Sequence, residues 1–232
     1  MLVFCRPTAN MPMGKRRMAE GIDSAEAASG TERLVMFSDG VIAIAITLLV
    51  LDIRLPELPA SADSAALAAA LLSIAPKIVA YGLSFLVVGE FWYVHHMRFT
   101  YIRRCDARLI WLNMLFLMTI GFVPFASSVL SEHPNATAYA LYDGTMACAA
   151  LLSAALWGYA IVGDRLVPSG LDPLIRRRSL AGPLRVAAVF VLSGVLAQID
   201  VRDARWAWFL LIPAAVEWHG RRRGRHHPAA RA

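Results

Sequence analysis

Polar side chains that could act inside an otherwise apolar sequence are few. Asp39 interrupts the stretch 33–51, which reads RLVMFSDGVIAIAITLLVL; His95 and His96 close a second apolar stretch, and Asn113 lies near the start of a third. A carboxylate within a membrane span costs roughly 2.5 to 3.5 kcal/mol on insertion scales. Asp39 is therefore either a functional group or a capping or packing carboxylate near a helix start.

Two kinds of chemistry are open to these groups, a proton relay and a metal site. Asp39 with His95 or His96 has the groups that a relay requires. Two adjacent histidines project from different sides of a helix and chelate poorly, so we expect no metal ion. We expect His95, His96 and Asn113 to serve instead as hydrogen-bonding partners between helices.

The composition places these groups in a membrane protein. The chain is 58% hydrophobic and only 17% charged, whereas soluble domains carry about 25% charged residues. The apolar stretches approach the length of about 20 residues that crosses a bilayer. The sequence predicts an all-α, multi-pass membrane protein with six transmembrane helices, at about 33–51, 65–97, 108–130, 136–162, 183–199 and 206–218.

The remaining segments read as tails and loops. Residues 1–30 are expected to form a disordered cytoplasmic tail, 31–219 the six-helix membrane domain, and 220–232 a basic cytoplasmic tail. Pro76 and Lys77 interrupt the second stretch, so its first turns should lie at the membrane surface or kink at the proline. The segment 163–179 is expected to be a basic loop.

The distribution of basic residues predicts the orientation. With the N-terminus inside, all of the 23 lysine and arginine residues except Arg54, Lys77, Arg202 and Arg205 fall on segments that should be cytoplasmic. Cytoplasmic loops carry such an excess. Both termini are therefore predicted to be cytoplasmic, which requires an even number of spans.

Other classes of function find no support in the sequence. Cytoplasmic arginines explain the net charge of +6 more simply than nucleic acid does, so no nucleic-acid partner is expected. Cys5, Cys105 and Cys148 have neither disulfide nor metal spacing. No nucleotide-binding loop, zinc signature or nucleophile elbow occurs. We expect no enzyme activity and no cofactor.

The first predicted helix carries a nearly uniform stripe. Steps of three and four residues place Phe37, Val41, Ile44, Thr47, Leu48 and Leu51 on one face. Asp39 falls on another face, with Ile42, Ala43, Ile46 and Val50, and Ser38 and Asp39 should turn toward neighbouring helices. Periodicity alone leaves open whether the stripe faces lipid, the core or a pore.

Arg33, Phe37, Ser38 and Asp39 spell RxxxFSD at the start of this helix, followed by GVIAIAITLLVLDI. Together with WYVHHMRF at 92–99 and NMLFLMTIGFVPF at 113–125, this resembles the transmembrane protein 175 family of potassium channels. The resemblance is clear over about 32–130 and rests on helix number and length beyond that.

The resemblance implies a potassium-preferring cation channel of the prokaryotic type, with one six-helix unit per chain. Four chains would assemble as a homotetramer around four copies of the first helix, without a carbonyl filter loop. Its constriction would be a ring of apolar side chains, here Ile44, then Leu48 and Leu51, with Thr47 as their polar neighbour. The motif residues Arg33, Ser38 and Asp39 would hold the first helix against the second and third.

Physical reasoning is consistent with such a pore. A tight apolar ring favours the ion that loses its hydration shell more easily, and potassium dehydrates more easily than sodium. The expected partners are K⁺ ions and the lipid bilayer of the plasma membrane. The alternative is a proton- or cation-coupled secondary transporter that uses Asp39 and His95 as its relay.

Two further expectations concern single carboxylates. Asp39 lies off the stripe, so Asp39 and Arg33 should be buried polar partners within one protomer. Asp52 follows Leu48 by four residues, and four copies at an outer mouth would raise the local cation concentration. The alternative for Asp52 is a loop carboxylate without a role in conduction.

Overall fold

The chain folds as a set of long helices. The structure, a computed structural model, describes residues 13–201, 204, 207 and 208. These residues form α1 (Met13–Leu48), the short 3₁₀ helix η1 (Leu49–Asp52), α2 (Ser64–Ser73), α3 (Ala75–Phe99), α4 (Ala107–Glu132), α5 (Ala136–Ile161), η2 (Val162–Asp164) and α6 (Pro173–Leu196). The described residues contain no strand, which confirms the predicted all-α class.

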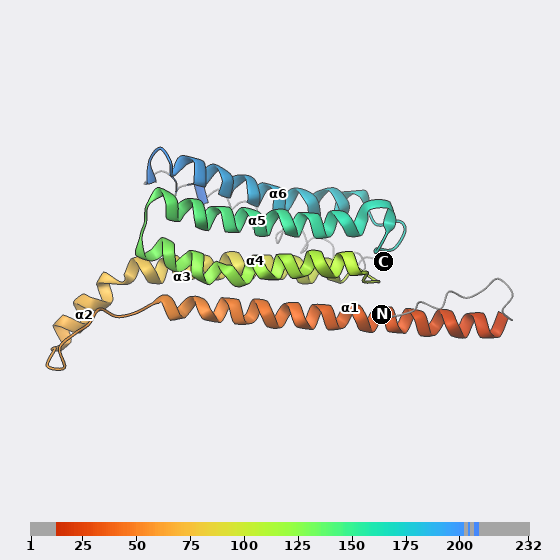
Figure 1. Ribbon diagram of the computed structural model, residues 1–232, viewed down its shortest axis with the longest axis horizontal. Coiled ribbons are helices and arrows are strands. Elements are labelled where there is room, and N and C mark those ends of the chain that lie inside the picture. Colours follow the sequence, from red (N-terminus) through yellow and green to blue (C-terminus); the bar gives the residue numbers. More distant parts are fainter. Residues whose placement is uncertain (1–12, 202–203, 205–206, 209–232) are drawn as a thin grey trace, which may run out of the picture.

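Five of these helices are long and apolar enough to span a membrane: Ser29–Asp52, Ala75–Phe99, Ala107–Glu132, Ala136–Asp164 and Pro173–Leu196. Figure 1 shows them roughly parallel, with α3 to α6 packed together and α1 along one side. The N-terminal part of α1 runs past the ends of the other helices. The predicted sixth span, 206–218, lies almost entirely outside the described residues.

Local sequence signals explain where the helices begin. The side chains of Asp63, Asp106, Asn135 and Asp172 accept backbone N–H groups in the first turns of α2, α4, α5 and α6. An N-cap of this kind satisfies a donor that the helix itself leaves free. Ile74 separates α2 from α3, and Pro76 lies in the first turn of α3. The second apolar stretch therefore breaks where the proline predicted an interruption.

Two predicted boundaries differ from the structure. The backbone is helical from Met13, whereas 1–30 was expected to be disordered. Helix α6 begins at Pro173, ten residues before the predicted start at Pro183, so part of the expected basic loop is helical. Hydropathy detects the part of a helix that crosses a membrane, while helices rich in Ala, Glu and Arg extend into water.

The core lies around α4 and α5. Phe116, Ile120 and Val123 of α4 meet Met146 and Trp157 of α5, all at most 1% exposed. Helix α6 packs on α5 at Gly158, where a Cβ atom would lie in van der Waals contact, 3.7 Å from the Leu180 side chain. Helix α1 packs against α4 and α3, so the helix with the sequence motif lies at the edge of this core.

Candidate pore helix

The buried face of α1 is set by residues at steps of three and four. Leu34, Ser38, Ile42, Ala45 and Leu49 are all buried. Ile42, Ala43, Ile46 and Val50 were predicted to share the face of Asp39; Ile42 is buried and Ile46 partly buried, but Ala43 and Val50 are exposed. The face that packs against α3 and α4 is thus centred on Ser38 and Ile42 rather than on Asp39.

The apolar stripe of α1 faces away from the protomer. Ile44 is 61% exposed, Leu48 44% and Leu51 64%, and the Thr47 side chain is also exposed. The Thr47 hydroxyl donates to the carbonyl oxygen of Ile44 at 2.8 Å. Phe37 extends the stripe two turns earlier at 49% exposure. These exposures exclude a role for Ile44 in packing the core of one protomer.

Ser38 joins α1 to α4 and α3 through a chain of hydrogen bonds. Its hydroxyl donates to the Leu34 carbonyl at 2.7 Å and accepts the Asn113 Nδ2–H at 2.9 Å. The Asn113 Oδ1 atom lies 2.8 Å from His95 Nε2. Because the Asn113 oxygen can only accept, His95 carries its proton on Nε2. Ser38, Asn113 and His95 are all buried, so three helices share one polar network.

The His95 ring is fixed by aromatic contacts as well. It stacks on Phe99 with ring centroids 4.4 Å apart and on Phe116 at 5.4 Å. Its Nδ1 atom is buried without a hydrogen-bond partner. Asp39 makes no hydrogen bond to His95 in the described part of the chain, so the two residues do not form the direct relay that a transporter would use.

Asp39 makes its contacts at the edge of the α1–α3 interface. Its Oδ1 atom accepts the Trp92 indole N–H at 2.8 Å, and its Oδ2 atom lies 3.9 Å from His96 Nδ1. The rings of Trp92 and His96 are 5.7 Å apart. His95 and His96 thus point to different helices, and within the described residues no group of three His, Cys, Asp or Glu side chains could hold a metal ion.

The expected Arg33–Asp39 pair is wrong for the protomer. Arg33 is exposed, and no carboxylate of the described residues lies within 4.0 Å of it. The reason is helical geometry: six residues separate the two positions, which puts Arg33 on the same side as the stripe and Asp39 well around the helix. Asp39 is instead held by α3.

Asp52 ends η1 and binds α4. Its two carboxylate oxygens accept the hydroxyls of Ser128 and Ser131, each at 2.5 Å. The side chain is partly buried. These bonds hold the residue after Leu51 against α4. The sequence did not indicate this contact, because the two serines lie more than seventy residues away.

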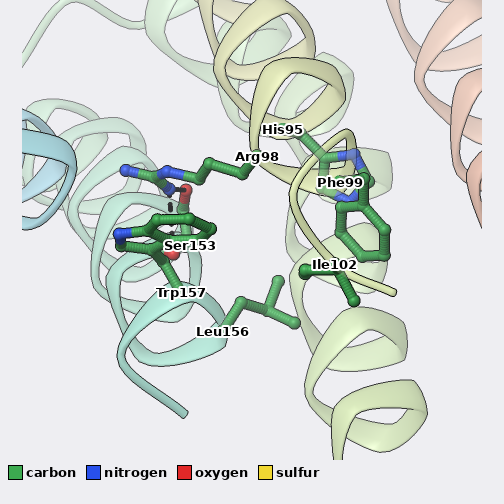
Figure 2. Close-up of a pocket in the computed structure, with 7 residues that line it drawn as sticks. All are labelled: His95, Arg98, Phe99, Ile102, Ser153, Leu156 and Trp157. Atoms are coloured by element: carbon green, nitrogen blue, oxygen red, sulfur yellow. Dashed lines mark hydrogen bonds between the residues drawn. The ribbon is translucent and has the colours of Figure 1, made fainter. Parts of the chain in front are cut away.

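Sequence reasoning missed a buried arginine at the end of α3. Arg98 is 6% exposed, and its guanidinium crosses to α5 and α6, as Figure 2 shows for Ser153. Nη1 donates to the Ser153 carbonyl at 3.0 Å and hydroxyl at 2.7 Å, and Nη2 donates to the Ser179 carbonyl. The guanidinium also lies 5.9 Å from the centre of the Trp157 ring.

A proline explains why Arg98 binds there. Pro183 lies inside α6 and has no N–H, so the helix leaves the carbonyl four residues earlier, that of Ser179, without its usual donor. Arg98 supplies that donor from another helix. Two features of the sequence could have indicated this contact. One is an arginine at the end of an apolar stretch, and the other is a proline inside a later predicted helix.

A second missed group is Asp143 of α5, which is 1% exposed. Its Oδ1 atom accepts the Trp208 indole N–H at 3.1 Å, and Trp208 also donates to the Ser193 hydroxyl at 2.9 Å. A Cβ atom on Gly194 would lie 3.4 Å from the Asp143 Cβ, in van der Waals contact, so α6 lies directly against Asp143 here. Asp143 therefore fixes Trp208 against α5 and α6.

The long apolar helices with polar groups buried between them define a multi-pass helical membrane protein. A sequence model of the family described as "Endosomal/lysosomal potassium channel TMEM175" matches residues 33–124. A potassium channel of Chamaesiphon minutus is 35% identical over 181 residues, which are 75% of this chain and 89% of that protein. The chain belongs to the TMEM175 family, a family of ion channels.

A solved structure and a longer relative extend the comparison. The crystal structure of a lysosomal potassium-selective channel TMEM175 homolog from Chamaesiphon minutus superimposes with a TM-score of 0.69 at 31% identity, covering 82% of this chain and 99% of that one. The endosomal/lysosomal proton channel TMEM175 of Bos taurus is 36% identical over 152 residues, which are 62% of this chain and 32% of that protein.

Proposed function

We propose that this protein is a potassium-preferring cation channel that conducts passively down the electrochemical gradient. Four protomers assemble as a homotetramer, and four copies of α1 line the pore. Ile44 forms the narrowest ring, followed by Leu48 and Leu51, with Thr47 as the polar neighbour. The names of the relatives in Chamaesiphon minutus support a potassium-conducting channel.

One observation carries the pore assignment. The stripe that includes Ile44 and Leu51 is more than 60% exposed at both positions, although the opposite face of α1 is anchored by buried hydrogen bonds. In a single protomer this stripe could face only lipid or another subunit. One helix per chain cannot enclose a path for ions, so a pore along this stripe requires several subunits.

The two faces of α1 have different roles: one binds the neighbouring helices and the other lines the pore. Ser38 binds Asn113 of α4 and fixes the rotation of the helix, and that rotation determines which side chains face the pore axis. Asp39 holds α1 close to α3 through Trp92. Ile44 then meets its three symmetry copies. An apolar ring of this kind opposes a hydrated ion and favours potassium over sodium, because sodium holds its water more strongly.

The location is inferred from the charges. We place both termini in the cytoplasm, following the arginine distribution along the chain, and we propose the plasma membrane as the location because the potassium channels that the chain resembles over most of its length are bacterial. A secondary transporter is the weaker alternative, since Asp39 bonds to Trp92 while His95 bonds to Asn113, and no bond joins the two parts of the supposed relay.

The experiment is a bilayer recording of the purified protein with Ile44→Asn. We expect conductance to rise and the potassium-to-sodium permeability ratio to fall, because a polar side chain admits water to the ring and sodium then gives up less hydration. If Ile44→Asn leaves both quantities unchanged, the pore does not pass through this ring.

A matched control is available on the same helical segment. Val50 is 46% exposed but lies off the stripe, among the residues that share the Asp39 side of α1. Val50→Asn introduces the same side chain between the levels of the Leu48 and Leu51 rings but off the stripe, so it should leave the permeability ratio unchanged. Equal effects of both variants would indicate a general disturbance of the helix rather than a change in the ring.

A further inference from the structure

Two loops meet at one end of the bundle. The segment 100–106 joins α3 to α4, and the segment 165–172 joins η2 to α6. The Arg103 backbone N–H donates to the Leu166 carbonyl at 2.9 Å, which ties the two loops together. In Figure 1 the start of α4 and the connection between α5 and α6 lie at the same end of the molecule.

These two loops and the first turn of α4 carry an excess of positive charge. Arg103, Arg104, Arg108 and Arg165 are all exposed. No carboxylate of the described residues lies within 4.0 Å of any of these four guanidinium groups. We call these four residues the basic loop pair.

The neighbouring carboxylates are already engaged. Asp106 caps α4 and accepts the Tyr159 hydroxyl at 2.5 Å, Asp164 pairs with Arg176, and Asp172 caps α6. One exposed acid of α1, Glu32, also lies near these loops. It follows Thr31, whose hydroxyl oxygen accepts a hydrogen bond from the Cys105 thiol. The four exposed arginines therefore outnumber the two acids of these loops, Asp106 and Asp172, and neither acid pairs directly with them.

An apolar surface continues from the basic loop pair along α4. Trp111, one turn after Arg108, is 70% exposed, and Met114 and Met118 follow on exposed positions of the same helix. Tryptophan favours the headgroup level of a bilayer, where its ring meets both apolar chains and water. The charged groups thus lie where lipid phosphates would lie, and the exposed α4 residues lie where acyl chains would pass.

We propose that the basic loop pair binds the phosphate of an anionic phospholipid, with the acyl chains against the exposed face of α4. Guanidinium groups bind phosphate oxygens in pairs of hydrogen bonds. Basic sites between membrane helices bind anionic headgroups, and each arginine near the surface strengthens binding by about fivefold. This inference does not depend on the proposed function, since it uses no residue of the α1 stripe.

The test uses tryptophan fluorescence of the full chain in vesicles. Brominated lipids quench the tryptophans they touch, and the difference between the wild-type protein and Trp111→Phe isolates the signal of Trp111. We expect brominated phosphatidylglycerol to quench Trp111 at several-fold lower content than brominated phosphatidylcholine, and high salt to reduce this preference. Equal quenching by both lipids in the wild-type protein would overturn the proposal.

Two variants locate the effect. Arg103→Gln/Arg104→Gln/Arg108→Gln should remove the preference, whereas Arg54→Gln, an exposed arginine beyond the other end of α1, should retain it. A preference that survives the triple variant would also overturn the proposal. Inorganic phosphate in place of chloride, at equal ionic strength, distinguishes the two sources of phosphate: if it abolishes the preference, the site takes the free ion and not a lipid.

Discussion

Replacing Arg98 by methionine tests whether this side chain supplies the hydrogen bond that the Ser179 carbonyl of α6 lacks because of Pro183. The change removes three hydrogen bonds, to the Ser153 carbonyl and hydroxyl and to the Ser179 carbonyl. Side-chain bonds in membrane proteins contribute about 0.6 kcal/mol each, and a buried carbonyl left unsatisfied costs about 1 to 3 kcal/mol. The variant no longer buries a positive charge, and this gain offsets part of the lost stability. We expect the free energy of unfolding to fall by about 2 to 4 kcal/mol.

The decisive measurement is a double-mutant cycle with Pro183→Ala. Alanine at 183 restores the N–H that can donate to the Ser179 carbonyl, so it should stabilise the Arg98→Met protein more than the wild-type protein, by about 1 kcal/mol. Unfolding in mixed micelles, followed by tryptophan fluorescence, gives the four free energies. Additivity within about 0.5 kcal/mol would refute the reasoning. Arg104→Met, at an exposed position, serves as the control and should change stability by less than about 0.5 kcal/mol.

Three other predictions concern single side chains. Asp39→Ala should reduce the yield of assembled protein in size-exclusion chromatography without altering ion preference, because Asp39 fixes α1 against α3; an assembled variant with changed selectivity would contradict this. Asp52→Asn should lower conductance at low salt and matter little at high salt; unchanged low-salt conductance would remove any role in conduction. Burial raises the pKa of the Cys105 thiol, so in a Cys5→Ser/Cys148→Ser background iodoacetamide should react with the folded protein only at higher pH than with the unfolded chain. The same shift lowers folded stability as pH rises above the ordinary thiol range, and a reaction profile equal to that of the unfolded chain would contradict it.

Helix positions could be predicted wherever a local signal defines them. Asp106 and Asn135 each precede an apolar run and cap it, and the predicted third and fourth spans start within one residue of α4 and α5. Pro76 marked the break before α3 for an equally local reason. The starts of α1 and α6 could not be found in this way, because runs of basic residues, Lys15 to Arg17 and Arg176 to Arg178, interrupt the apolar pattern within their first two turns.

The orientation of α1 shows where local reasoning ends. Ser38 and Asp39 are adjacent and differ by about 100° around the helix, and both are polar in an apolar stretch. Only the positions of Asn113 on α4 and Trp92 on α3 decide that Ser38 is buried while Asp39 lies at the edge. The outward direction of Ile44 follows from that choice, as does the exposure of Arg33. A pattern within one helix defines its faces, but the partner helices determine which face is covered.

The bond between Arg98 and Ser179 also constrains the order in which the protein assembles in the membrane. During synthesis α3 is complete about eighty residues before the ribosome reaches Ser179, so Arg98 enters the bilayer region before its acceptors exist. Its place in the last turn of α3 lets the long side chain reach the water boundary during this interval. Only the arrival of α5 and α6 gives the guanidinium its three acceptors inside the bundle. Helices α5 and α6, made after α3, therefore complete the insertion of α3.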